Sequence, residues 1–341
     1  TEGLKIVFFG SGVIGGSVGG WIASQYDNVR FLDQGKVAET LKSKGITLYH
    51  GDEPEQRETV AVEVIDDLDE ARDADVIVIG VKNYSLEPVA ELIREKVGDG
   101  LVIVAMQNGV VNQKILPKYF SKVIFCIVSY NAWMDELCTI GYQKKGPLYL
   151  GTLDNTLQVE MKAIARVFNL GVETHITDRL KDAAHCKLVL NLTNSLTTLI
   201  GHKYRELSDR ALFQKLLTNL TWEGVRIIRA AGFRESKLGG MPPWKIIWVG
   251  ARIPRIITKG IFEKNVKKMV LSSMAQDIIQ RGGSESELES INGYLLALAD
   301  KHGVEAPYNR TIYDLCVREF GKPGFEPLAM EAVWAAVKEE L

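Results

Sequence analysis

The feature that most constrains how this chain folds is a glycine-rich turn between a strand pattern and a helix pattern. Residues 5–9 have the sequence KIVFF, which is typical of a buried strand, and Gly10-Ser11-Gly12-Val13-Ile14-Gly15 follows directly. The residues after this turn keep a helical pattern to about Tyr26. A GxGxxG sequence between a strand and a helix is typical of a βαβ unit that binds a dinucleotide.

Each part of this turn has a predicted role in cofactor binding. Gly10 permits the tight turn, Gly12 lets the backbone approach a pyrophosphate, and Gly15 lets the helix pack closely. The N–H groups of Val13 and Ile14 at the start of the helix would face the phosphates, with Ser11 in the same loop. The alternative is a glycine-rich turn without a ligand.

A carboxylate follows the second predicted strand, at Asp33, 18 residues after Gly15. In folds of this kind an acid at this place holds the ribose hydroxyls of the cofactor. Asp33 would repel a 2′-phosphate, and the next residue is Gln34 rather than an arginine, so we expect NAD to be preferred over NADP. NADP stays possible because Lys36 could partly neutralise a phosphate, and Asp33 could instead only cap the next helix.

The first half of the chain alternates strand and helix patterns. Continuous apolar runs predict strands that are covered on both faces, as in a parallel sheet. We therefore expect an α/β Rossmann domain with a mostly parallel sheet over residues 1–177. Segments 46–50 and 59–65 are expected to form an added hairpin. The predicted strands are residues 5–9, 29–33, 76–81, 101–105 and 123–128.

From residue 178 the strand pattern ends, and we expect an all-α C-terminal domain over 178–341. Residues 238–262 are apolar and basic, and Pro242, Pro243 and Pro254 preclude one continuous helix there. This segment is expected to pack on the helical domain; the alternatives are a substrate lid or a contact in a homodimer. The clearest helical patterns are residues 181–200, 212–231, 264–281, 284–302 and 331–341.

Charge and cysteine content limit the partners of the chain. Its 341 residues have 41 Lys plus Arg against 43 Asp plus Glu, a net charge of −2, which predicts no nucleic-acid or membrane partner. The four cysteines form no CxxC pair and have no histidine at ligand spacing, so we expect no disulfide framework and no metal. A small-molecule substrate and a reducing cytoplasm fit best. The apolar stretch 4–23 is interpreted as part of the fold, since its glycines suit a signal helix poorly.

Further polar residues lie where a site is expected. Lys82 and Asn108 follow the third and fourth predicted strands, whose carboxyl ends face the ligand in this architecture. Either residue could instead be an ordinary loop residue. On the helix pattern from 178, Lys187 and Asn191, followed by Asn194 or Ser195, share one face. A partly desolvated lysine there has a lowered pKa and can donate a proton near neutrality, although a lysine snorkelling from a helical core would give the same pattern.

Six sequence blocks, in order along nearly the whole chain, resemble the ketopantoate reductase (2-dehydropantoate 2-reductase) family. They are the glycine turn from Gly10, GVK at residues 80–82, QNG at 107–109, KxxxN at 187–191, SSMAQD at 272–277, and Glu287 followed by ING at 291–293. The resemblance implies a Rossmann domain followed by a helical domain, and reduction of a 2-oxo acid to an R-2-hydroxy acid.

The resemblance also implies roles for individual residues. Lys187 would be the general acid that protonates the forming alkoxide while a nicotinamide delivers hydride, and Glu287 would position this lysine. Asn191 and Ser273 would bind substrate, and Asn108 would contact cofactor or substrate. The second asparagine of the family falls at Ser195 here, with Asn194 one residue earlier.

Three functions remain open from the sequence. The leading one is an NADH-preferring 2-dehydropantoate 2-reductase. The first alternative is an NAD-dependent D-2-hydroxyacid dehydrogenase of the D-mandelate type, because Asp33 departs from the arginine usual in the family and residues 238–262 are long, with Trp244 and Trp248. The second alternative is a noncatalytic NAD-binding regulator that keeps the fold.

Overall fold

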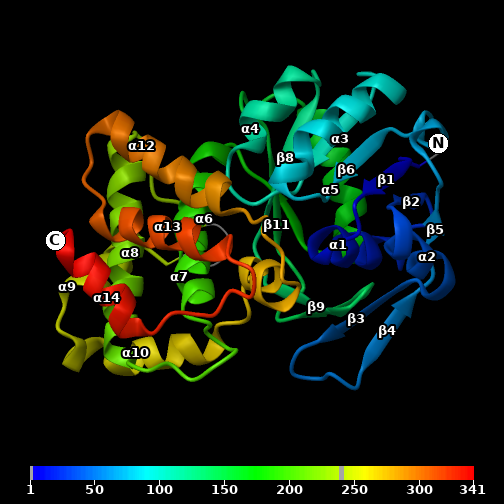
Figure 1. Cartoon of the computed structure of the whole chain (residues 1–341). Helices are drawn as coiled ribbons and strands as arrows, with labels where there is room; N and C mark the ends of the chain where they lie inside the picture. Colours follow the sequence, from blue (N-terminus) through cyan, green and yellow to red (C-terminus); the bar gives the residue numbers. More distant parts are fainter. Residues whose placement is uncertain (1–2, 238–241) are drawn as a thin grey trace. The chain divides into compact units, whose positions relative to one another are not determined.

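The chain divides into two compact units, residues 1–180 and 181–341. The structure is a computed structural model that describes residues 3–237 and 242–341 (Figure 1). The first unit is α/β and the second is helical, in agreement with the fold class expected from the sequence.

A mostly parallel sheet forms the centre of the first unit. All five predicted strands are present, and their registers are parallel from β2 through β1, β6 and β7 to β8. The full order is β12-β11-β8-β7-β6-β1-β2-β5, with β11 antiparallel to β8. The strands are β1 (Ile6–Phe9), β2 (Val29–Leu32), β5 (Glu63–Val64), β6 (Val76–Ile79), β7 (Val102–Ala105), β8 (Val123–Val128), β11 (Leu148–Gly151) and β12 (Thr174–Ile176).

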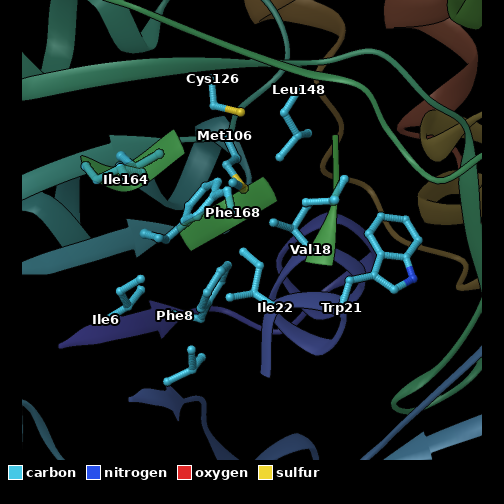
Figure 2. Close-up of a cluster of buried hydrophobic side chains, with 14 of the residues drawn as sticks. Ile6, Phe8, Val18, Trp21, Ile22, Met106, Cys126, Leu148, Ile164 and Phe168 are labelled. Carbon is cyan, nitrogen blue, oxygen red and sulfur yellow. The ribbon is translucent and has the colours of Figure 1, made fainter. Parts of the chain in front are cut away.

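Helices bury this sheet because its strands are apolar on both faces. Every residue of β1, β6, β7 and β8 is buried. Figure 2 shows one core cluster, in which Phe8 of β1 and Cys126 of β8 lie among side chains of α1 and α5, including Ile22 and Phe168. The helices of this unit are α1 (Val13–Ala23), α2 (Gly35–Lys44), α3 (Asn83–Lys96), α4 (Asn112–Ile115) and α5 (Gln158–Gly171), with short 3-10 turns η1 (Leu68–Ala71) and η2 (Leu116–Lys118).

The predicted hairpin belongs to a second sheet. β3 (Ile46–His50) pairs antiparallel with β4 (Arg57–Val60), as expected. The predicted second strand, 59–65, is wrong in extent, because residues 63–64 leave the hairpin and pair with β2 in the large sheet. The small sheet has the order β4-β3-β10-β9 and includes β9 (Ala132–Glu136) and β10 (Thr139–Tyr142), which the residue pattern did not single out.

The second unit consists of helices and helical turns in the part that the structure describes. They are α6 (Leu180–Asn191), α7 (Thr193–Leu199), α8 (Arg210–Ala230), α9 (Trp244–Arg252), α10 (Arg255–Lys268), α11 (Ser273–Ala275), α12 (Tyr294–His302), α13 (Pro307–Phe320) and α14 (Met330–Glu339), with π-helical turns η4 (Gln276–Gln280) and η5 (Glu289–Gly293).

Three of the predicted helices are interrupted. The 181–200 pattern is divided at Leu192 into α6 and α7, and Ser195 N–H bonds back to the Leu192 carbonyl three residues earlier. The 264–281 pattern is divided because α10 ends at Lys268 and Ser272 begins a new helix, its hydroxyl accepting from the N–H of Ala275. The 284–302 pattern becomes regular α-helix only from Tyr294, after η5.

Residues 244–268 form two helices, α9 and α10, with Pro243 and Pro254 at their N-caps. The prediction that prolines preclude one continuous helix here is confirmed. Residues 238–241 of the predicted segment 238–262 lie outside those that the structure describes. The hydroxyl of Thr258 on α10 accepts a hydrogen bond from Gln214 Nε2 of α8 at 2.8 Å. This bond holds α10 to α8, but the expectation that the apolar side chains of the segment pack on the helical domain is wrong for Trp248, Ile256, Ile257 and Ile261, which are exposed.

Among the described residues, none of the helices is long and apolar enough to cross a membrane.

Candidate functional site

The glycine turn between β1 and α1 has the geometry expected of a loop that accepts a phosphate. Gly10 has a φ of +93°, which L side chains rarely adopt. A Cβ on Gly15 would lie 2.1 Å from the Gly10 carbonyl oxygen, whereas a Cβ on Gly12 would meet nothing within 4 Å. Gly15 is thus required for packing within the loop, and the space at Gly12, the N-cap of α1, is open to a ligand.

Asp33 is bonded to this loop. Its Oδ2 accepts from the N–H of Ser11 at 2.6 Å, and its Oδ1 accepts from the N–H of Gln34 at 2.8 Å. The N-cap of α2 is Gln34 and no side chain caps that helix, so the alternative role of Asp33 as a helix cap is wrong. Because a carboxylate has about four acceptor positions, Asp33 keeps capacity for the hydroxyls of a ribose.

One buried polar atom in the same loop fits a polar ligand. Ser11 is only 1% exposed, and its Oγ has no hydrogen-bond partner among the described residues. Buried hydroxyls in proteins are nearly always bonded, so an unpaired one in this loop fits a phosphate or ribose group as its partner. The residues present therefore fit a dinucleotide.

Lys82 and Asn108 lie at the carboxyl ends of neighbouring parallel strands. Lys82 is the N-cap of α3, just after β6, and Asn108 follows β7. Asn83 Nδ2 donates to the carbonyl oxygen of Asn108 at 2.7 Å, which joins the two loops. A Cβ on Gly80 would lie 2.6 Å from the Gly10 carbonyl, so the loop before Lys82 packs directly on the glycine turn.

Three amides that fix these loops were missed as site residues. Gln107 Nε2 donates to the carbonyls of Ile79 and Val81, at 2.8 and 3.1 Å, and its Oε1 accepts from Asn112 Nδ2 at 3.3 Å. Together with Asn83, these side chains hold the ends of β6 and β7. The available signal was a polar Gln directly after the apolar run 101–106, where a buried amide must find partners.

On the second unit, Lys187 and Asn191 lie on the last turns of α6, and both are half-buried. Asn191 Nδ2 is buried and has no hydrogen-bond partner among the described residues, which fits an amide that binds a polar substrate. Asn194 is also half-buried. The helix break at Leu192 separates Asn194 and Ser195 from the regular spacing that the sequence analysis assumed.

Ser195 is placed differently from the other predicted substrate residues. It is 0% exposed, and its Oγ donates to the Leu192 carbonyl at 2.8 Å and accepts from Asn292 Nδ2 at 3.0 Å. A substrate contact at Ser195 stays a prediction, and the burial of the Ser195 side chain disfavours such a contact.

Ser273 and Glu287 lie in the irregular part of the helical unit. Ser273 is the first residue of α11, after the capping residue Ser272, and is half-buried. Glu287 is only 4% exposed and lies two residues before η5. π-helical turns such as η4 and η5 occur often at functional sites.

The neighbours of Lys187 on α6 include Cys186 and His185, which are both buried. Burial raises the pKa of the Cys186 thiol, so this cysteine is not an activated nucleophile. His185 Nε2 lies 2.8 Å from the Tyr294 hydroxyl, and its Nδ1 lies 2.7 Å from the Lys181 carbonyl. Burial also raises the pKa of Tyr294.

Other features do not point to further chemistry. Within residues 3–237 and 242–341, no group of three or more His, Cys, Asp or Glu side chains could hold a metal ion. The four cysteines are buried, and none of them is in a disulfide. A hollow of about 1050 Å³, which includes Asp300, Arg310 and Glu339 in its lining, contains none of the predicted site residues.

Comparisons with known proteins agree with this arrangement. The sequence profile described as "Ketopantoate reductase PanE/ApbA" matches residues 6–155, and "Ketopantoate reductase PanE/ApbA C terminal" matches residues 179–318. A 2-dehydropantoate 2-reductase of Archaeoglobus fulgidus is 25% identical over 91% of this chain and 96% of its own length. The enzyme of that name from Pyrococcus abyssi is 24% identical over 92% and 96%.

Solved structures show the same fold. A ketopantoate reductase of the PanE/ApbA family from Ralstonia eutropha has a TM-score of 0.71 at 20% identity and covers 99% of both chains. D-mandelate dehydrogenase with NADH and anilino(oxo)acetate has a TM-score of 0.75 at 18% identity, again over 99% of both chains.

The fold, the polar residues at the strand ends of the first unit and the polar residues on the helices of the second unit define a class of protein. It is the class of oxidoreductases that combine a Rossmann-type unit with a helical unit. Within this class the chain belongs to the ketopantoate reductase family, since the two family profiles cover most of its length. It is therefore an oxidoreductase that acts on the CH–OH group of a 2-hydroxy acid. This excludes the alternative of a noncatalytic regulator.

Proposed function

We propose that the protein is an NADH-preferring reductase that converts 2-dehydropantoate (ketopantoate), a branched 2-oxo acid, to its R-2-hydroxy acid. The observation that carries the choice of substrate is the similarity to 2-dehydropantoate 2-reductases over more than nine-tenths of both chains. The observation that carries the cofactor preference is the Asp33 carboxylate, bonded to the N–H of Ser11 in the glycine turn.

The first unit would hold the dinucleotide. Gly10, Gly12 and Gly15 shape the turn, and the N–H groups of Val13 and Ile14 at the start of α1 suit the charge of a pyrophosphate. Asp33 would accept from the ribose hydroxyls and repel a 2′-phosphate, while Lys82 and Asn108 would contact the cofactor from the neighbouring strand ends. When bound, the nicotinamide supplies hydride.

The second unit would supply the proton and the substrate contacts. Lys187 would donate a hydrogen bond, and then its proton, to the substrate oxygen on which negative charge develops. Glu287 would orient the lysine ammonium. The polar groups of the oxo acid would be bound by Asn191, Asn194 and Ser273. The Nδ2 of Asn191 is buried and has no hydrogen-bond partner among the described residues, so it is available for such a bond.

A second candidate function is NAD-dependent D-2-hydroxyacid dehydrogenase activity of the D-mandelate type. It is supported by the likeness in fold to D-mandelate dehydrogenase, whose solved structure contains NADH. The two functions differ in substrate side chain and share the predicted catalytic residues.

One assay separates these possibilities. NADH consumption by the purified protein is followed with ketopantoate and with benzoylformate, and each reaction is repeated with NADPH. We expect faster turnover of ketopantoate and preference for NADH. Faster turnover of benzoylformate would establish the second function, and turnover with NADPH alone would contradict the role given to Asp33.

We further propose that the protein is a homodimer that works in a reducing compartment such as the cytoplasm. Support for the dimer comes from α9 and α10, on which Trp248, Ile256, Ile257 and Ile261 are exposed, Ile256 to 90%. Several large exposed apolar side chains on two consecutive helices are typical of a face that another protein covers. The reducing compartment is supported by the four cysteines, none of which is in a disulfide.

A further inference from the structure

Two hydroxyl groups of α7 connect segments that carry different predicted site residues. Ser195 and Thr198 are three residues apart, so they lie on one face of this short helix. Both are 0% exposed. Each bonds to another segment of the helical unit, and each of these segments lies close in sequence to a predicted site residue.

The first connection runs from Ser195 to Asn292 in η5. Asn292 is 1% exposed, and its Nδ2 donates to Ser195 Oγ at 3.0 Å. The same hydroxyl donates to the carbonyl of Leu192, where the helix that carries Lys187 is interrupted. Asn292 lies five residues after Glu287. The bond therefore ties the end of the lysine-bearing helix to the turn that follows the glutamate.

The second connection runs from Thr198 to Ser272. Their hydroxyl oxygens are 3.3 Å apart, and Ser272 caps α11, whose first residue is Ser273. α7 is thereby bonded also to the segment that carries Ser273, the predicted substrate-binding serine. A third contact, from Cys316 Sγ of α13 to the Ser195 carbonyl at 3.6 Å, fixes the backbone at the same point.

We propose that Ser195 is a positioning residue, which through Asn292 sets the placement of the Lys187 helix relative to the Glu287 segment, and that it is not a substrate contact. This inference rests on the proposed roles of Lys187 and Glu287. It assigns a different task to the place where the family resemblance implied substrate binding.

The energetic reason is the burial of the Asn292 carboxamide. Its Oδ1 has no partner among the described residues, and the Ser195 hydroxyl is the partner of its Nδ2. Without that hydroxyl, both polar atoms of the carboxamide would be buried and unbonded, which is costly. The η5 turn would have to shift to relieve this cost, and Glu287 would shift with it.

Ser195→Ala tests the proposal by kinetics. We expect kcat to fall by about tenfold or more, since small misplacements of catalytic groups are costly. KM for the 2-oxo acid and the Kd for NADH should change little. A rise in KM with unchanged kcat would instead make Ser195 a substrate contact and overturn the proposal. Asn292→Ala should give the same loss, and the double variant should lose little more than either single variant.

Thr193→Ala is the matched control. Its hydroxyl bonds back to a carbonyl three residues earlier, as that of Ser195 does, here to Leu190 at 2.8 Å. We expect this variant to keep wild-type kcat. Equal losses of kcat in Thr193→Ala and Ser195→Ala would show a merely structural effect and overturn the proposal. If Ser195→Ala does not fold, the nearly isosteric Ser195→Cys, a weaker hydrogen-bond acceptor, replaces it and should show a smaller loss.

A readout without turnover separates this inference from the proposed function. The pH dependence of Lys187 acetylation, measured by peptide mass spectrometry, gives the midpoint at which this amine becomes reactive. Displacing Glu287 should move the midpoint to lower pH in Ser195→Ala, by about half a unit or more, and leave it in place in Thr193→Ala. An unchanged midpoint in Ser195→Ala would overturn the inference. Failure of the wild type to reduce any 2-oxo acid would instead count against the proposed function.

Discussion

Asp33 shows how far single residues could be predicted from the sequence. Its place after the second strand predicted an acid near a ribose, and the structure bonds its carboxylate to the N–H of Ser11 in the glycine turn. The spacing could not show this bond, because Ser11 and Asp33 meet only when β1 and β2 pair in parallel.

Replacing Asp33 by Ala together with Gln34 by Arg should shift cofactor preference towards NADPH. The change removes a carboxylate that repels a 2′-phosphate and adds a guanidinium that can bind it. We expect a shift of about 1–3 kcal/mol in the ratio of kcat/KM for NADPH and NADH. Gln34→Arg alone is the control, with a smaller expected shift. An unchanged ratio in the double variant would contradict the selection of NAD by Asp33.

Lys187→Ala should abolish most of the turnover while leaving NADH binding intact. Loss of a general acid costs about 10²–10⁴-fold in rate. Stopped-flow measurement of kcat and fluorescence titration of NADH would test both expectations. Lys181→Ala, an exposed lysine of the same helix, is the control. Unchanged turnover in Lys187→Ala would remove this residue from the mechanism.

His202 should make the fold sensitive to mild acid. Burial lowers the pKa of its imidazole to about 4, from the usual value of about 6.5. Between these two pH values the unfolded chain therefore binds more protons than the folded chain. The contribution of neutral His202 to the free energy of unfolding is complete above about pH 6.5 and is lost as the pH falls towards 4. The loss amounts to about 1–3 kcal/mol.

His202→Phe keeps a ring that can stack on Phe213 and removes this titration. We expect the fall in Tm between pH 7 and pH 5 to be smaller in this variant than in the wild type. His302→Gln, at the exposed end of α12, should leave the fall unchanged. The same fall in His202→Phe and wild type would show that His202 is not responsible.

At the scale of elements, strands were predicted better than helix ends. The apolar runs of β1, β2, β6, β7 and β8 are strong signals because a strand buried on both faces has nearly every residue apolar. The helical patterns 181–200, 264–281 and 284–302 hid breaks, because apolar periodicity continues across a capping serine or a π-helical turn. Ser272 was a usable signal, since serine is a preferred N-cap.

Two glycines of the glycine turn allow the effects of a substitution on NADH binding and on stability to be separated. Gly12→Ala should fold normally, because its Cβ would meet nothing within 4 Å and its φ of −65° suits any residue. It should nevertheless weaken NADH binding by blocking the approach of the pyrophosphate. Gly15→Ala should destabilise the fold, because its Cβ would lie 2.1 Å from the Gly10 carbonyl.

Thermal unfolding and NADH titration of both variants would check this difference. Gly12→Ala should keep the wild-type Tm and lose affinity, whereas Gly15→Ala should lower Tm by several degrees. Wild-type affinity in a well-folded Gly12→Ala would mean that no phosphate approaches the turn.

At the scale of the whole molecule, the apolar face of α9 and α10 predicts a dimer. α10 is bonded to α8 through Thr258, while its Ile257 and Ile261 side chains are exposed to 69% and 67%. Light scattering should show a dimer at micromolar concentration, and Ile257→Glu with Ile261→Glu should give a monomer. Val317→Glu, an equally apolar exposed position on α13, should stay dimeric. A monomeric wild type would contradict the prediction.

The sequence by itself determined the fold class, the dinucleotide turn, the carboxylate after β2 and the family, because these depend on local order and spacing. The tertiary structure decided which polar side chains are used inside the protein: Asn83 and Gln107 fasten two strand ends, and Ser195 is buried against Asn292. Such roles depend on contacts between residues far apart in the chain. A buried polar group must find its partner wherever packing places one, and spacing along the chain does not show where that is.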